Sequence, residues 1–302
     1  MILVDMNQIA IASAMMQLRL SKDSQLDENM VRHMILNSLR NYRNQYGPNS
    51  VYDGTRSSNM YTYYGELVLC YDDKKNWRKD YFPNYKFSRK KSRNESEHDW
   101  NEIFNVLNKI KEELIRYFPY KVVQVDSAEA DDIIGSVVFH WTPHFKETQE
   151  RIMIISSDKD FAQLHKYDYV DQHSPIAKML ITFSGGNKYI KEHILKGDRS
   201  DGVPNILSGD DVFAEGLRQK PLSKKKISEW LDMNPEDFCD ENMLRNYQRN
   251  EKLISLKHMP TEVMQSCWKE FNKGRNEISR KKLFDYFIDN KLNELINDIG
   301  DF

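Results

Sequence analysis

Cysteine is scarce in this chain of 302 residues, which contains three. Cys70, Cys239 and Cys267 form no C-x-x-C pair, so the sequence indicates neither a zinc knuckle nor a disulfide framework. The sequence also has no run of about 18 apolar residues, the length that a membrane helix needs. Its N-terminal apolar segment has no basic flank of the kind that opens a signal peptide. We therefore expect no membrane association and a reducing, cytoplasmic location.

An excess of positive charge is missing as well. Lys and Arg number 44 against 46 Asp and Glu, which gives a formal net charge of −2. The net charge alone therefore indicates no nucleic-acid partner, and the distribution of charge along the chain must decide.

Strand and helix patterns alternate through the first two-thirds of the chain. Short apolar runs predict four strands, at 2–5, 66–72, 120–126 and 152–155. Apolar periodicity predicts helices at 27–46, 99–118 and 128–141, the second of them capped by Asp99. This alternation is typical of an α/β fold with a mostly parallel central sheet and helices on both faces. Residues 46–65 predict a long loop, and the last hundred or so residues predict helices without a clear strand.

Acidic side chains gather where the predicted strands end. Asp5, Asp72 and Asp126 each close a strand, and Asp158 and Asp160 follow the fourth. Because parallel strands end at one edge of a sheet, we expect most of these carboxylates to converge there. Negative charges this near to one another need a positive charge between them, and this is usually a hard divalent cation with oxygen ligands. The sequence therefore predicts a pair of Mg²⁺ ions about 3.5–4 Å apart, with Mn²⁺ as a substitute.

Two further segments add acids: Glu129, Asp131 and Asp132 in the first turn of a predicted helix, and Asp198 and Asp201 in a later loop. Each segment has a simpler interpretation on its own. Asp126 and Glu129 fit a capping box, and acids in a first helical turn gain from the helix dipole. Asp198 and Asp201 alone fit a solvated loop. Their combination with the strand-end acids favours a metal centre. Asp126 would lie beside this centre in a structural role and would not be one of its ligands.

Residues 74–93, "KKNWRKDYFPNYKFSRKKSR", combine nine Lys or Arg with one acid and five aromatic residues. Cations neutralise phosphates and aromatic faces accept stacked bases, so this stretch predicts a nucleic-acid interface. A solvated charge run is the alternative. We expect the stretch to be mobile without DNA, because like charges repel. The predicted nucleic-acid contacts are Lys74, Lys75, Trp77, Arg78, Lys79, Tyr85, Lys86, Arg89, Lys90, Lys91 and Arg93.

Several of these segments, in this order, resemble the 5′-nuclease superfamily, which includes flap endonucleases and the T-even phage type of ribonuclease H. The motifs are "WRKD" (77–80), "YKFSR" (85–89), "EADD" (129–132), "ISSDKDFAQL" (155–164) and "LKGDRSDGV" (195–203). The resemblance covers nearly the whole chain. It implies a 5′→3′ exonuclease and flap endonuclease with ribonuclease H activity, which removes RNA primers and adjacent DNA during lagging-strand replication.

The resemblance also implies roles for individual residues. Arg78, Lys86 and Arg89 would hold the phosphate at the cleavage site, and Arg78, Lys86, Asp131 and Asp158 would be catalytic. The metal shell would consist of Asp5, Asp72, Glu129, Asp131, Asp132, Asp158, Asp160, Asp198 and Asp201.

For the architecture, the resemblance implies a PIN-like nuclease core over residues 1–185, with a basic arch at 74–98. A helical DNA-binding region over 186–302 would carry a degenerate helix-hairpin-helix, because Asn205 and Ser208 stand where glycines are common. The implied partners are DNA and RNA–DNA duplexes with a 5′ end, flap or fork, and replication proteins such as a single-strand-binding protein or sliding clamp. The short N-terminus leaves little room for a leader peptide that recruits them. A monomer in the cytoplasm of a bacterial host is expected.

Two other functions stay open at this point. A phosphatase of the haloacid-dehalogenase type uses a D-x-D motif, although usually near its N-terminus and followed by Gly-Thr. A non-catalytic DNA-binding replication module would keep the basic arch without needing nine acids. Cleavage of a 5′ flap that depends on Mg²⁺ would separate both from a nuclease.

Overall fold

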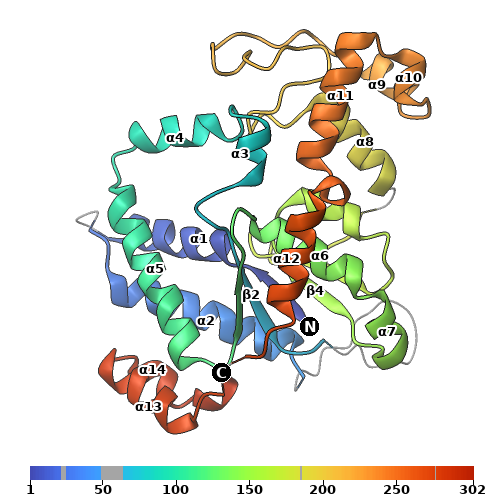
Figure 1. Cartoon of the computed structure of the whole chain (residues 1–302). Coiled ribbons are helices and arrows are strands. Elements are labelled where there is room, and N and C mark those ends of the chain that lie inside the picture. Colours follow the sequence, from blue (N-terminus) through green and yellow to red (C-terminus); the bar gives the residue numbers. More distant parts are fainter. Residues whose placement is uncertain (22–24, 49–63, 184–185, 276) are drawn as a thin grey trace.

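A six-stranded sheet forms the centre of the computed structural model, which describes residues 1–21, 25–48, 64–183, 186–275 and 277–302 (Figure 1). The strand order is β3-β2-β1-β4-β5-β6, and every neighbouring pair is parallel except β5–β6. The strands are β1 (Ile2–Asp5), β2 (Leu67–Tyr71), β3 (Lys121–Gln124), β4 (Ile152–Ile155), β5 (Val170–Ser174) and β6 (Met179–Ile181). The predicted α/β fold with a mostly parallel sheet is confirmed, and so are its four predicted strands.

Both faces of the sheet are buried, which explains why its central strands are continuous apolar runs. Successive side chains of a strand point to opposite faces. In β1, Ile2 and Val4 join one hydrophobic cluster and Leu3 joins another. All three side chains are fully buried.

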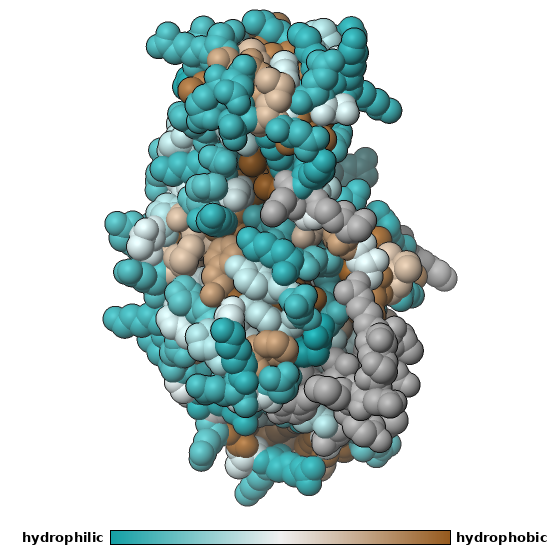
Figure 2. All heavy atoms as spheres, turned by 90° about the vertical axis from the view of Figure 1, so that its right-hand side faces the viewer, coloured by the Kyte–Doolittle hydropathy of each residue, from teal (hydrophilic) through white to brown (hydrophobic). Residues whose placement is uncertain are grey.

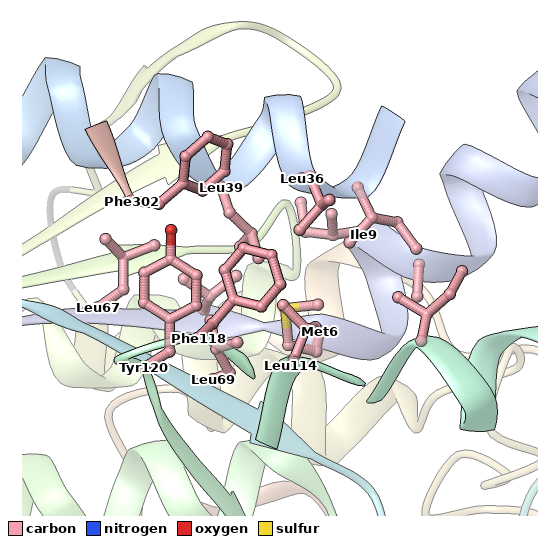
Figure 3. Packing of buried hydrophobic residues seen from close by; sticks show 14 of the residues in the cluster. Met6, Ile9, Leu36, Leu39, Leu67, Leu69, Leu114, Phe118, Tyr120 and Phe302 are labelled. Atoms are coloured by element: carbon pink, nitrogen blue, oxygen red, sulfur yellow. The ribbon is translucent and has the colours of Figure 1, made fainter. Parts of the chain in front are cut away.

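The first face is covered by α1 (Met6–Leu20), α2 (Glu28–Tyr46) and α5 (Trp100–Tyr117). Figure 3 shows Met6 and Ile9 from α1, Leu36 and Leu39 from α2, and Leu114 from α5 meeting over this face. Helix α5 begins as predicted, because the Asp99 carboxylate accepts hydrogen bonds from the backbone N–H groups of Asn101 and Glu102 at 2.9 and 3.1 Å.

The second face is covered by α6 (Ala130–His140) and α12 (Thr261–Phe271), with the 3-10 helix η1 (Lys159–Leu164) beside them. Helix α7 (Thr142–Thr148) and the 3-10 helix η2 (Leu256–His258) complete this layer. Helices α13 (Arg280–Asp289) and α14 (Asn293–Ile296), with η3 (Ile299–Asp301), return to the first face. The C-terminal residues therefore pack on both faces of the sheet, and the boundary at 185/186 stays a prediction.

A third hydrophobic cluster lies beyond the sheet and forms the upper part of Figure 1. It joins α8 (Gly186–Lys196), α9 (Lys224–Trp230) and α11 (Glu241–Ile254), with α10 (Pro235–Phe238) at its side. Two residues that follow α3 (Trp77–Tyr81), Phe82 and Tyr85, pack into the same cluster. Figure 2 shows this part of the surface covered mainly by hydrophilic side chains.

The elements that were not predicted from the sequence include α1, β5 and β6, and also the short helices α3 and α7 and the helix that ends the basic stretch, Phe87–Asn94. Most of the predicted loop at 46–65 lies outside the described residues. Among the residues that the structure does describe, the helices are all too short or too polar to cross a lipid bilayer.

Candidate active site

Carboxylates from five segments of the chain line one pocket at the carboxyl edge of the sheet, with a volume of about 940 Å³. Asp5 ends β1, Asp72 follows β2, and Asp158 and Asp160 follow β4. The start of α6 and the loop after α8 supply the others. We call this set the carboxylate cluster: Asp5, Asp72, Glu129, Asp131, Asp158, Asp160, Asp198 and Asp201. The predicted convergence of acids at this edge is therefore present.

Local hydrogen bonds fix the strand-end acids. Asp5 caps α1 by accepting from the Gln8 N–H at 3.3 Å, and its other oxygen accepts from Ser156 Oγ at 3.0 Å. Asp72 accepts from the backbone N–H of Ala130 at 2.8 Å, which ties β2 to the start of α6. Asp158 caps η1 by accepting from the Asp160 N–H at 2.8 Å. Each carboxylate therefore sits at a helix N-terminus that orients it.

Four of these acids form no ion pair with a cation of the described chain, and the charge of Lys86 only partly offsets the repulsion around three of them. Burial, followed by the charge of Asp72, raises the pKa of Asp5 to about 7. Burial and the neighbouring Asp160 raise the pKa of Asp158 to about 6. The pKa of Asp72 and that of Asp131 are also raised, again mainly by burial and then by neighbouring carboxylates. Bringing a cation to this side of the pocket would relieve the repulsion.

Glu129 has the opposite environment. Its burial favours the protonated form, but the charges of Lys86 and Arg78 outweigh that effect and lower its pKa to about 2. Lys86 Nζ forms an ion pair with Glu129 Oε1 and lies 3.6 Å from Asp201 Oδ2. Tyr85 bridges the same two acids, donating at 3.0 Å to Glu129 or at 2.9 Å to Asp201. One side of the pocket is thus neutralised by the protein itself and the other is not.

His193 was missed in the sequence. It extends from α8 between two acids, with Nδ1 at 2.9 Å from Asp160 Oδ1 and Nε2 at 3.8 Å from Asp198 Oδ2. Asp198 also accepts from the Ser200 N–H and hydroxyl, both at 2.7 Å. A lone histidine 33 positions after Asp160 carries no signal in the sequence, because only the fold brings the two together.

The donor set of the uncompensated side suits a hydrated hard cation. Within the described part of the chain, no three His, Cys, Asp or Glu side chains gather closely enough to hold a metal ion on their own. Mg²⁺ usually keeps several waters and takes only one or two protein carboxylates directly. The uncompensated acids offer only oxygen ligands, and their negative charges repel one another; they are Asp5, Asp72, Asp131 and Asp158. The residues present therefore fit such an ion.

Asp132 does not belong to the carboxylate cluster, which corrects the prediction. Its side chain is fully buried, and Arg78 donates to its two oxygens with Nη1 and Nη2 at 2.8 Å each. Trp77 Nε1 and the Glu129 N–H donate to the same carboxylate at 3.0 Å. With four donors around it, Asp132 acts as a structural acceptor below the pocket.

Three predicted nucleic-acid contacts are largely buried, although Arg78 and Tyr85 also line the wall of the pocket. Trp77, Arg78 and Tyr85 expose 6%, 3% and 4% of their surfaces, too little for base stacking or a phosphate clamp. Arg78 Nε also donates to the Leu253 carbonyl of α11 at 3.0 Å, so its whole guanidinium group is engaged. These residues anchor the base of the basic arch. The burial of these side chains speaks against the predicted mobility at the base of the arch, and for α4 (Phe87–Asn94) the mobility stays a prediction.

The other predicted cations have different positions. Lys75 is exposed and lies 3.5 Å from Asp126, an exposed pair outside the pocket. Lys90 and Lys91 belong to α4, and their side chains lie outside what the structure describes. The pocket itself is lined by Lys74, Lys79, Lys86, Arg89 and Arg93.

Lys86 is held in a backbone conformation that non-glycine residues rarely adopt. Its φ is 55°, in the left-handed region, and its N–H donates to the Asp201 carbonyl at 2.7 Å. The facing Gly202 has φ 75°, and a Cβ there would lie 2.7 Å from the Asn84 carbonyl oxygen. Arg89 Nη2 lies 2.5 Å from Asp201 Oδ1. The arch base and the 198–203 loop are therefore locked together, which aims Lys86 into the pocket.

Comparisons with known proteins agree with this geometry. The family profile described as "5'-3' exonuclease, N-terminal resolvase-like domain" matches residues 49–192, and that of "T4 RNase H, C terminal" matches residues 186–302. Ribonuclease H of Enterobacteria phage T4 is 32% identical over 310 residues, which cover 99% of this chain and 95% of that protein. A 5′-3′ exonuclease of Buchnera aphidicola subsp. Schizaphis graminum is 29% identical over 150 residues, or 47% of this chain and 48% of that protein.

Two solved structures share the fold at 14% sequence identity and a TM-score of 0.55. One is a phage T5 5′-exonuclease with bound zinc, for which 89% of this chain aligns with 97% of that one. The other is a phage T5 flap endonuclease in a pseudo-enzyme–product complex with DNA and metal ions, with 89% and 96% aligned. At this identity the likeness supports the fold alone.

Proposed function

This chain belongs to the family of 5′-3′ exonucleases that includes the ribonuclease H of phage T4, and we propose that it is a Mg²⁺-dependent 5′ nuclease. Its substrates would be DNA and RNA–DNA duplexes that carry a 5′ end, flap or fork. The reaction would be hydrolysis of a phosphodiester near that 5′ end by a two-metal mechanism.

One observation carries the proposal. The pocket has an uncompensated acidic side, with Asp5, Asp131 and Asp158, and a cationic side, with Lys86 and Arg89. A phosphodiester needs both, because cations neutralise its charge while an activated water attacks it. A simple DNA-binding module does not require this pairing within one cavity.

Each side has a distinct part in the proposed mechanism. Asp5, Asp72, Asp131 and Asp158 would hold the ions, which supply an activated water and stabilise the leaving oxygen. Lys86 would bind a non-bridging oxygen of the scissile phosphate, where negative charge grows in the transition state. Glu129 and Asp201 keep Lys86 protonated and aimed, since both raise its pKa against the effect of burial. Arg89 would hold a neighbouring phosphate.

The biological setting follows from the same family. We place the enzyme in lagging-strand replication in the cytoplasm of a bacterial host, where it would remove RNA primers and the adjacent DNA. Replication proteins such as a single-strand-binding protein or a sliding clamp would be its partners, and the monomer would suffice for cleavage because one chain supplies the whole pocket.

A cleavage assay tests the proposal. The wild-type protein should cut a 5′-labelled flap with Mg²⁺ and leave it intact in EDTA. A blunt duplex, which has no unpaired 5′ strand, should be a poorer substrate. Release of inorganic phosphate without shortening of the strand would instead identify a phosphatase. Tight binding of the flap without cleavage in either Mg²⁺ or Mn²⁺ would identify a non-catalytic module.

A further inference from the structure

One wall of the pocket carries several amide side chains and has no part in the mechanism above. Helix α5 lines the pocket with Asn101, Asn105 and Asn108, and Lys111 follows one turn further on. These positions are spaced i, i+4, i+7 and i+10, so they form one stripe along the helix. We call Asn101, Asn105 and Asn108 the asparagine stripe.

The asparagine stripe differs from the other two faces of α5. One face is apolar, with Ile103, Ile110 and Leu114 buried against the sheet. The outer face is charged and exposed, with Glu102 and Glu112 as examples. The pocket side instead presents three amides in succession before its first charged residue, Lys111, and this succession calls for a chemical explanation.

The amides of the asparagine stripe are available to a ligand. All three side chains are exposed, and among the described residues none of their amide groups is engaged in a hydrogen bond. An amide offers two donors and one acceptor without a charge. Such groups recognise base edges and sugar hydroxyls, whereas phosphates are better bound by cations.

The asparagine stripe is continuous with the catalytic end of the pocket. At its far end, Arg93 lies over the rings of Trp100 and Phe104 at 5.2 and 5.0 Å. At its near end, Lys111 Nζ donates to Gln124 Oε1 at 2.9 Å, and Gln124 Nε2 donates to the Asp72 carbonyl at 3.2 Å. The stripe therefore leads from the basic arch towards the carboxylate cluster, and Figure 1 shows α4 and α5 joining above α1 on this side.

From this placement we infer that the asparagine stripe binds the nucleosides of the single-stranded 5′ segment of the substrate. The inference rests on the proposed nuclease function and adds a site to it. Seven residues of helix span about 10 Å, the rise of about three stacked nucleotides. The amides hydrogen-bond bases or ribose 2′-hydroxyls, while Arg93 and the other arch cations neutralise the phosphates.

The test compares a triple variant, Asn101→Ala/Asn105→Ala/Asn108→Ala, with the wild type and with an outer-face control, Glu102→Ala/Glu112→Ala. Affinity is measured by fluorescence anisotropy in Ca²⁺, with the integrity of each substrate checked on a gel. The four ligands share one duplex: a DNA flap, an RNA flap, a flap of abasic DNA, and the duplex without a flap. Circular dichroism confirms that each variant is folded.

We expect the triple variant to lose at least about tenfold in affinity for the DNA and RNA flaps, as three hydrogen bonds at the weak end of the usual range would give. The abasic flap and the plain duplex should change less than twofold, as should every ligand with the control variant. An equal loss on DNA and RNA indicates base contacts, and a larger loss on RNA indicates 2′-hydroxyl contacts. Asn105→Lys should add a phosphate contact and steepen the salt dependence of single-strand binding by about 0.7.

Unchanged affinity of the triple variant for both flaps would overturn the inference while leaving the nuclease function intact. An equal loss on all four ligands would also overturn it, because contacts to nucleosides cannot act on an abasic strand. A wild-type protein that neither binds nor cuts the DNA flap would refute the nuclease proposal and this inference with it.

Discussion

Replacing Arg78 by methionine should lower the free energy of unfolding by about 3 kcal/mol, near the lower end of what breaking a buried ion pair costs. The guanidinium group is 3% exposed and pairs with both oxygens of Asp132 at 2.8 Å. Without Arg78 the carboxylate stays buried but keeps two donors, Trp77 Nε1 and the Glu129 N–H. Those donors hold the expected cost at about 3 rather than 5 kcal/mol.

Urea unfolding followed by far-UV circular dichroism measures this cost. The matched control is Lys79→Met, in the same helix and exposed, which should change stability by less than about 0.5 kcal/mol. A double-mutant cycle of Arg78→Met with Asp132→Asn should give a coupling energy of about 2–3 kcal/mol, since the two side chains are in direct contact.

The same variants decide between a structural and a phosphate-binding Arg78. If Arg78 anchors the arch and Glu129 without binding phosphate, Arg78→Met should lose less than about tenfold in single-turnover rate at a temperature where it is folded, because Lys86 still pairs with Glu129. The reasoning is refuted if Arg78→Met loses less than about 1 kcal/mol of stability yet loses turnover by a hundredfold or more, as a missing transition-state contact would cause. Arg78 would then bind phosphate, as the motif alone implies.

Three further predictions concern the pocket. Lys86→Ala should reduce single-turnover cleavage by about 10²–10³-fold, the usual cost of removing a transition-state charge partner, and weaken flap affinity much less; equal losses in both would make Lys86 a simple binding cation. Ca²⁺ should support flap binding without turnover, because its looser and larger coordination does not align two ions and a water, so efficient cleavage in Ca²⁺ alone would contradict a two-metal mechanism. Amide hydrogen exchange in α4 should slow when a flap is bound, whereas Trp77 and Arg78 in α3 should be protected in the free protein; strong protection of α4 without substrate would show a rigid surface helix.

The positions of the strands and of the strand-end acids could be predicted because both follow from local patterns. Runs such as Ile152–Ile155 are continuously apolar, and a parallel sheet places the acids that follow them at one edge. Strand β5 could not be found in this way, because it includes Gln172, a buried polar residue. That side chain is satisfied by the carbonyls of Ser156 and Asp158 at 2.8 and 2.7 Å, partners that only the fold supplies.

Adjacent acids with different roles were harder to separate. Asp131 and Asp132 are neighbours on α6, so their side chains point about 100° apart and face different surroundings. Asp131 faces the pocket and Asp132 meets Arg78, which is 54 positions away in the sequence. Similarly, an aromatic residue among cations suits either base stacking or core packing. Trp77 packs in the core because the Asp132 carboxylate lies within reach of its indole N–H.

The central claim is that the uncompensated acids hold the divalent cations that hydrolyse the substrate. Single-turnover cleavage of a labelled flap by Asp131→Asn and Asp158→Asn, together with flap affinity in Ca²⁺, tests it most directly. Each amide keeps the shape of the acid but loses the charge that binds Mg²⁺, so both variants should bind the flap and fail to cut it at saturating Mg²⁺. Cleavage by either variant at close to the wild-type rate would contradict the account.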